Sequence, residues 1–249
     1  MQAVRVNNDI YRELGARWYH AEDDPVALLR AEAALRNPWI DAELARAFGP
    51  GPRDVLDVGC GAGFLANDLA ARGHRVVGID LSLEALEVAR AHDRTGTVDY
   101  REGDAAAPDL PAARFDCVCA LDLLEHVEVP EDVVAGAARV LRPGGLFFFH
   151  TFDRSWLSWL VVIKGVEWFV KNTPAHMHVL RYFIRPAELR AMCRRHGLEP
   201  VEIRGVSPRI DRAFFQMLRT RTVPPAFRFV FGRSGRSPRT GYAGFARKA

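Results

Sequence analysis

The 249-residue sequence lacks the features that mark membrane-spanning, secreted and fibrous proteins. It has no apolar run of about eighteen residues, which a membrane-spanning helix needs, and no internal repeat. Its N-terminal stretch contains no apolar segment typical of a secretion signal, so we expect a cytoplasmic location. The remaining composition, with 49% hydrophobic and 26% charged residues, is typical of one globular domain.

Cysteine and lysine are also scarce. The four cysteines follow neither a disulfide framework nor the ligand spacing of a zinc site, so we expect reduced thiols. Arginine supplies most of the positive charge, and segment 204–249 holds eleven Lys or Arg residues against one acid. Aromatic residues lie among them, as in some RNA-binding proteins, but no RNA-binding module accompanies them, so we expect no nucleic-acid partner. Attraction to anionic lipid is another role for this basic tail.

Short apolar runs alternate with helical periodicities along the chain. This alternation predicts a single α/β domain with a Rossmann-like fold, whose sheet is seven-stranded, mostly parallel and covered on both faces. The predicted strands are 54–58, 76–80, 97–101, 115–121, 145–151, 198–206 and 240–248. The predicted parts are a helical cap (1–50), a cofactor-binding half (51–151), an apolar insert or lid (152–184), and a C-terminal half with the basic tail (185–249).

A glycine loop follows the first predicted strand. Gly59, Gly61 and Gly63 let the backbone turn sharply and approach a ligand closely, and the next helix begins with free N–H groups. Asp80 ends the second predicted strand, where the diol of a ribose would lie. A plain turn is the alternative, but the two features together indicate a nucleoside ligand. The GxGxG spacing differs from the GxGxxG of dinucleotide-binding proteins and speaks against an oxidoreductase.

The stretch DVGCGAG at 57–63 resembles the cofactor loop of class I S-adenosylmethionine (SAM) methyltransferases. That family has the same Rossmann-like fold, so the resemblance agrees with the predicted sheet. It also implies that SAM is the cofactor, held by residues at the ends of the first four strands: Asp57, Gly59, Gly61, Gly63, Asp80, Leu81, Asp104, Ala105 and Leu121.

A wider resemblance extends from about residue 12 to residue 205. The stretches LGARWY, DLLEHV, FDRSWLSWL and HMHVLRYFIRPAEL are similar to the UbiG family of ubiquinone-biosynthesis O-methyltransferases. The resemblance implies methyl transfer to a phenolic or catecholic hydroxyl of a small aromatic substrate, either a polyprenyl quinone precursor or a secondary metabolite. A non-catalytic, SAM-binding subunit at a membrane is the alternative function.

An acid and imidazole cluster, DLLEH, follows the fourth predicted strand. On one helical turn, Asp122, Glu125 and His126 would point toward one place. The family resemblance implies that they are catalytic and bind a divalent cation such as Mg²⁺, since a metal ion or a His base favours the phenolate. The alternative is a cluster that only shapes the pocket. His178 matches a family His that would close over the substrate, or is a structural His.

The N-terminal cap departs from the family pattern. Relatives place an Arg just after an Asn-Pro pair, at the carboxylate of SAM, whereas Trp39 follows Pro38 here. We therefore expect Arg36 or Arg17 to replace that contact.

The apolar segment 156–170 contains three tryptophans and a narrow polar stripe. It is too short to span a bilayer but could lie in the interface, which would make the protein peripheral to the inner membrane. A buried helix that acts as a substrate lid is the other hypothesis.

Overall fold

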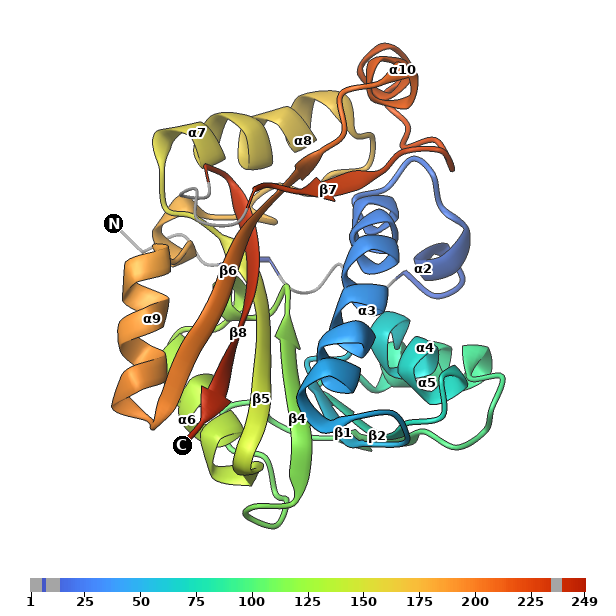
Figure 1. Cartoon of the computed structure of the whole chain (residues 1–249). Coiled ribbons are helices and arrows are strands. Elements are labelled where there is room, and N and C mark those ends of the chain that lie inside the picture. Colours follow the sequence, from blue (N-terminus) through green and yellow to red (C-terminus); the bar gives the residue numbers. More distant parts are fainter. Residues whose placement is uncertain (1–5, 8–13, 234–238) are drawn as a thin grey trace.

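Figure 1 shows a central sheet with helices on both faces. The computed structural model describes residues 6–7, 14–233 and 239–249. Strands and helices alternate through its first part, and strands β1 to β5 pair in parallel, as connections through helices allow. These elements are β1 (Asp54–Val58), α4 (Phe64–Ala71), β2 (Arg75–Asp80), α5 (Leu83–His92), β3 (Asp99–Glu102), β4 (Phe115–Leu121), the 3₁₀ helix η1 (Leu124–His126), α6 (Pro130–Val140) and β5 (Leu141–Phe152).

The C-terminal strands complete the sheet in the order β3-β2-β1-β4-β5-β8-β6-β7. Strand β8 (Gly241–Lys248) lies between β5 and β6 (Leu198–Pro208), antiparallel to both. The predicted Rossmann-like sheet is confirmed, but within the described residues it has eight strands where the sequence predicts seven. The additional strand, β7 (Phe229–Phe231), pairs with the end of β6. Three residues are too few for strand periodicity to show in the sequence.

A layer of helices lies over the carboxyl ends of the parallel strands (Figure 1). The N-terminal cap is helical as predicted, although residues 1–5 and 8–13 lie outside the described residues. Residues 156–169 of the insert form one coil of three consecutive helical pieces, and its last piece packs beside α10 (Arg212–Thr220). No helix in the described part is long and apolar enough to cross a membrane. The layer consists of α2 (Arg17–His20), the first half of α3 (Val26–Phe48), α7 (Trp156–Ser158), the π-helix η2 (Trp159–Lys164), α8 (Gly165–Phe169), η3 (Leu180–Tyr182) and α10 (Arg212–Thr220).

Alternate residues of each central strand face two separate cores. Val118 and Phe147 belong to the core beneath α6 and α9 (Pro186–Arg195), whereas Cys117 and Phe148 belong to the core beneath α3, α4 and α5. Strands that are buried on both faces read as continuous apolar runs. This is why the apolar pattern alone located them. The four cysteines are buried and free of disulfides.

Candidate active site

The carboxyl ends of the parallel strands meet at one edge of the sheet, where open α/β proteins bind their ligands. The loop after β1 turns through Gly59, Gly61 and Gly63, whose φ angles are 67°, 50° and 80°. A Cβ atom at Gly59 would come within 2.7 Å of the Leu123 side chain, and one at Gly61 would lie 3.4 Å from Trp18. The glycines therefore let this loop approach its neighbours more closely than side chains would allow.

A cavity of about 320 Å³ opens beside the glycine loop. Gly63 does not line it and lies instead against Tyr100. Arg36 reaches it from α3, whereas Arg17 pairs with two aspartates of the α2–α3 connection. Of the two arginines proposed for the cap, only Arg36 is therefore placed to contact a ligand there. The predicted cofactor residues that line the cavity are Asp57, Gly59, Gly61, Asp80, Leu81, Asp104, Ala105, Leu121 and Arg36.

Two carboxylates shape the electrostatics of this cavity. Asp80 accepts hydrogen bonds from the N–H groups of Gly61 (2.8 Å) and Ser82 (2.9 Å), which fixes the glycine loop to the end of β2. Asp57 is only 3% exposed, and burial, reinforced by the charge of Asp80, raises its pKa to about 8. A positively charged ligand would favour the ionised form of Asp57. The cavity therefore suits a nucleoside that carries a sulfonium or an ammonium group.

The predicted helical turn at residues 122–126 is wrong. Asp122 has a left-handed backbone (φ 54°), which aspartate tolerates better than most residues, and η1 begins only at Leu124. The Asp122 carboxylate lies 2.7 Å from Nη1 of Arg36 and also contacts Nδ1 of His150. Burial acts to raise the pKa of Asp122, but the charges of Arg36 and His150 outweigh it and hold that pKa below its usual range.

Glu125 is bound by strand β5. Its carboxylate accepts a hydrogen bond from the Thr151 hydroxyl at 2.7 Å. Burial, together with the nearby charge of Asp122, raises the pKa of Glu125 to about 8. Glu125 and Asp122 therefore have separate partners and separate protonation behaviour.

The side chains expected to bind a metal ion do not form a common ligand set. In the part of the chain that the structure describes, the His, Cys, Asp and Glu ligand atoms within 4.8 Å of one another belong to Glu32, Asp122 and His150. Arg36 already forms an ion pair inside that group. A divalent cation prefers anionic and water oxygens and would be repelled by the guanidinium. The residues present therefore do not fit a metal ion at Asp122, Glu125 and His126.

Three buried residues of this region escaped the sequence analysis: Glu32, His150 and Thr151. The parallel register pairs Leu121 with His150, so His150 and Thr151 lie at the same sheet edge as the residues after β4. Polar residues after the apolar run GLFFF were a usable signal for them. Glu32 had no such signal, because it lies inside a long helix and approaches Asp122 only in the folded chain.

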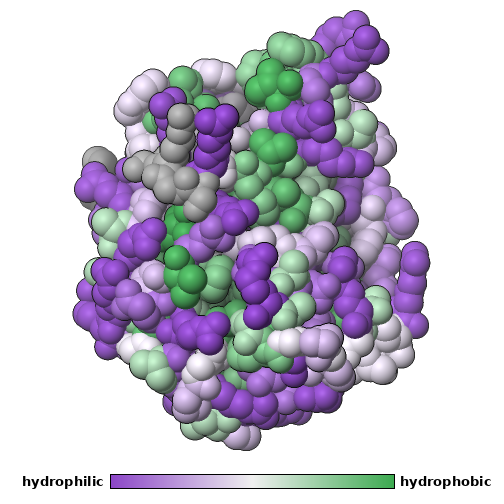
Figure 2. Space-filling view, in the orientation of Figure 1, coloured by the Kyte–Doolittle hydropathy of each residue, from purple (hydrophilic) through white to green (hydrophobic). Residues whose placement is uncertain are grey.

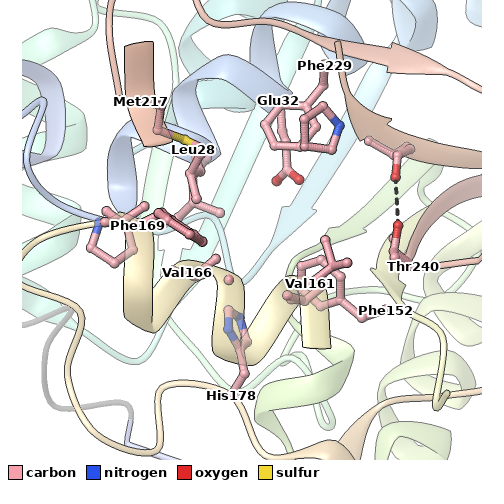
Figure 3. Close-up of a pocket in the computed structure, with 18 of the residues that line it drawn as sticks. Leu28, Glu32, Phe152, Val161, Val166, Phe169, His178, Met217, Phe229 and Thr240 are labelled. Atoms are coloured by element: carbon pink, nitrogen blue, oxygen red, sulfur yellow. Dashed lines mark hydrogen bonds between the residues drawn. The ribbon is translucent and has the colours of Figure 1, made fainter. Parts of the chain in front are cut away.

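A second cavity of about 450 Å³ lies under the insert (Figure 3). Its walls are mainly apolar and come from α3, the insert, β6, β7 and α10. In Figure 3, Glu32 and His178 point into it from opposite sides. The polar side chains in its lining are Glu32, Asp122, His126, His178 and Thr240.

His126 and His178 lie together at this second cavity. Their ring centroids are 5.6 Å apart, and His178 also packs edge-on against Phe152 at 5.2 Å. Withdrawal from water lowers the pKa of His126 to about 4 and that of His178 to about 3. Both imidazoles are therefore neutral at pH 7, and a negative charge beside them would be needed to favour their protonation. His176, which the sequence made the weaker candidate, is exposed.

The two cavities meet at three residues. Leu29, Asp122 and His126 line both of them. A ligand in the polar cavity and a ligand in the apolar cavity would therefore face each other at this junction, which is the arrangement that a group transfer between two small molecules requires.

Comparison with known protein sequences identifies the family. Residues 56–149 match the family model described as a methyltransferase domain. Ubiquinone biosynthesis O-methyltransferases from Aromatoleum aromaticum and Thiobacillus denitrificans are each 40% identical to the chain, over 79% of its length and 83% and 84% of theirs. The chain belongs to this family. It is a SAM-dependent O-methyltransferase, which confirms the predicted resemblance, enzyme class and cofactor.

Solved structures of lower sequence identity support the fold. Magnesium protoporphyrin IX methyltransferase from Synechocystis, solved with bound S-adenosylhomocysteine, superposes with a TM-score of 0.61 at 17% identity over 97% of both chains. A putative methyltransferase from Bacillus halodurans gives 0.59 at 23% identity, over 83% of this chain and 97% of that one.

Proposed function

We propose that this O-methyltransferase transfers a methyl group to a phenolic or catecholic hydroxyl of a small aromatic acceptor that carries an apolar substituent. A polyprenyl precursor of ubiquinone has this chemistry, and the relatives are named for ubiquinone biosynthesis. The main support is the junction at Leu29, Asp122 and His126, where a polar cavity beside the glycine loop meets a larger apolar one.

In this proposal the smaller cavity holds SAM. Asp80, which lines this cavity, would bind the ribose hydroxyls, and Asp57 would compensate the positive end of the ligand. Arg36 is the residue of the cap that could meet its carboxylate. The adenine would lie among the remaining predicted contacts, which are Leu81, Asp104, Ala105 and Leu121.

His126 is the proposed general base. SAM supplies a methyl carbon on a positively charged sulfur, which the acceptor oxygen attacks as the carbon–sulfur bond breaks. A phenol has a pKa near 10 and is a weak nucleophile until it loses its proton. His126 lies at the junction and is neutral, so it can take that proton, and the nearby phenolate then favours the imidazolium. His178, which lies beside His126 and lines the apolar cavity, would orient the ring of the acceptor.

A divalent cation is not part of the proposed mechanism, because Asp122 and Glu125 are already bound to Arg36, His150 and Thr151. We expect that EDTA leaves turnover unchanged in a continuous assay of S-adenosylhomocysteine release. Loss of turnover with EDTA that Mg²⁺ alone restores would contradict this mechanism and show that the enzyme needs a divalent cation.

The insert suits an acceptor that partitions into a membrane. Leu160 and Val161 line the apolar cavity, whereas Trp156 is 73% exposed. Figure 2 shows hydrophobic side chains gathered in the upper part of the visible face, between α8 and α10. We therefore propose that the insert is both lid and peripheral membrane contact, with one face over the substrate and the other against lipid.

The decisive experiment measures S-adenosylhomocysteine release with an alkyl-substituted catechol. Wild-type protein should turn over, and His126→Ala should lose about 10²- to 10⁴-fold in kcat, the usual contribution of a general base, while its affinity for S-adenosylhomocysteine stays the same. His176→Ala is the matched control, because His176 is exposed and lines neither cavity. A protein that binds SAM but releases no S-adenosylhomocysteine with any phenol or catechol tested would contradict the proposal.

A further inference from the structure

The apolar cavity contains a carboxylate that the proposed mechanism does not use. Glu32 is 5% exposed, lies on α3 among Leu28, Leu29 and other apolar residues, and points its oxygens into the cavity (Figure 3). A buried carboxylate is costly unless hydrogen bonds or charges compensate it. The presence of the Glu32 carboxylate in a mainly apolar cavity therefore needs an explanation.

The contacts of Glu32 within the described residues are incomplete. Its nearest ion-pair contact is Nη1 of Arg36 at 3.8 Å, beyond hydrogen-bond distance. The same Nη1 lies 2.7 Å from Asp122, so Arg36 is committed mainly to Asp122. Burial raises the pKa of Glu32 to about 7, although the charges of His150 and Arg36 act against it, so the ionised form predominates above pH 7. The Glu32 carboxylate can therefore accept further hydrogen bonds, and its oxygens point into the apolar cavity where a ligand would bind.

Two other polar groups of the cavity have partners within the chain. The Asp122 carboxylate is taken by Arg36 and His150, and the Thr240 hydroxyl donates to the backbone carbonyl of Val206 at 3.5 Å. A ligand group that meets Glu32 must donate a hydrogen bond, because a carboxylate only accepts. Glu32 has a ligand atom within 4.8 Å of one on Asp122, which borders the junction of the cavities. The donor must therefore lie close to the reacting oxygen.

We propose that Glu32 accepts a hydrogen bond from a hydroxyl group next to the methyl-accepting oxygen, and so makes the enzyme selective for vicinal diphenols over monophenols. This assignment rests on the proposed function, since it needs a phenolic acceptor in the apolar cavity. Glu32 is a specificity residue in it, while His126 remains the base. An acceptor without the second hydroxyl leaves the Glu32 carboxylate buried and unpaired, which is how polar sites reject such analogues.

The test compares a pentyl-substituted catechol with the matching pentyl-substituted phenol. Wild-type protein should prefer the catechol in kcat/KM, and Glu32→Leu should reduce that preference at least tenfold, mainly by weaker catechol binding and improved phenol binding. Glu32→Gln keeps an acceptor oxygen and should retain part of the preference. Glu43→Leu is the matched control, because Glu43 is also buried on α3 but pairs with Arg46 and lines neither cavity.

Binding of each phenol to the protein saturated with S-adenosylhomocysteine, followed by calorimetry, gives a second readout that does not need turnover. A purely structural Glu32 would change the melting temperature of its variants and leave the catechol-to-phenol ratio as in wild type, which would overturn this assignment alone. Wild-type protein that neither binds nor methylates any phenol would overturn the proposed function and this assignment together.

Discussion

Single residues of the glycine loop determine whether the cofactor cavity forms. Gly63 has a φ of 80°, and a Cβ atom there would overlap the Tyr100 hydroxyl and lie 3.0 Å from the Cβ of Ala89. We expect Gly63→Ala to destabilise the protein by about 3 kcal/mol, because left-handed strain and overpacking add. It should also weaken S-adenosylhomocysteine binding, although Gly63 does not line the cavity. Urea denaturation and calorimetry measure the two effects.

Gly73 provides the matched control for this substitution. Its φ is also positive, at 92°, but a Cβ atom there would meet nothing within 4 Å. Gly73→Ala should therefore cost only the backbone strain, about 1 kcal/mol, and leave cofactor binding unchanged. Equal losses of stability in the two variants would show that packing against Tyr100 is unimportant.

Among the elements of the fold, the insert allows membrane contact to be tested separately from catalysis. Trp156 and Trp159 are 73% and 43% exposed and line neither cavity. Replacing both with Ser should weaken sedimentation with phosphatidylglycerol vesicles at least tenfold, about 1.4 kcal/mol, because Trp side chains favour the lipid interface. Turnover of a water-soluble catechol should not change.

A control for this variant is Val129→Ser, which removes an exposed apolar side chain at the start of α6. It should bind vesicles as the wild type does. If the double Trp variant also sedimented like the wild type, the insert would be a lid without a membrane role.

The sequence could predict those features of the site that depend on residues near one another in the chain, and not those that depend on contacts between distant elements. The glycine loop and Asp80 were predictable, because adjacent strand ends in a parallel sheet meet at one edge. The orientation of Asp122 was not, since its left-handed backbone is stabilised by Arg36 and His150, which come from a distant helix and strand. Glu32 escaped for the same reason. Metal ligation was implied by the family resemblance together with the local spacing, and only the folded chain shows that Arg36 pairs with Asp122 there.

For the whole molecule, the buried titratable groups predict a free energy of unfolding that falls as the pH rises from about 4.5, and falls most steeply above pH 6.5. Burial raises the pKa of Asp57 and Glu125 to about 8 and that of Glu32 to about 7, so the folded chain binds more protons than the unfolded chain above pH 4. Stability from these groups is therefore lost progressively as the pH rises from about 4.5 to the folded pKa values of about 7 and 8. His126 and His178, whose pKa values are lowered, act in the opposite direction below pH 6.5, because there the unfolded chain binds more protons.

The expected loss between pH 6.5 and 8 is about 1.4 kcal/mol per pH unit for each proton retained, measured by urea denaturation without ligand. Glu125→Gln should reduce the loss of stability between pH 6.5 and 8, because a neutral amide cannot ionise. The amide oxygen can still accept the hydrogen bond from the Thr151 hydroxyl. Saturating SAM should reduce this loss as well, since a positive ligand beside Asp57 lowers the pKa of that carboxyl, whereas an apolar acceptor analogue should not. A free energy of unfolding that stays constant or rises from pH 6.5 to 8 would mean that these carboxyls are already ionised in the folded protein, and that Asp57 does not depend on a cationic ligand.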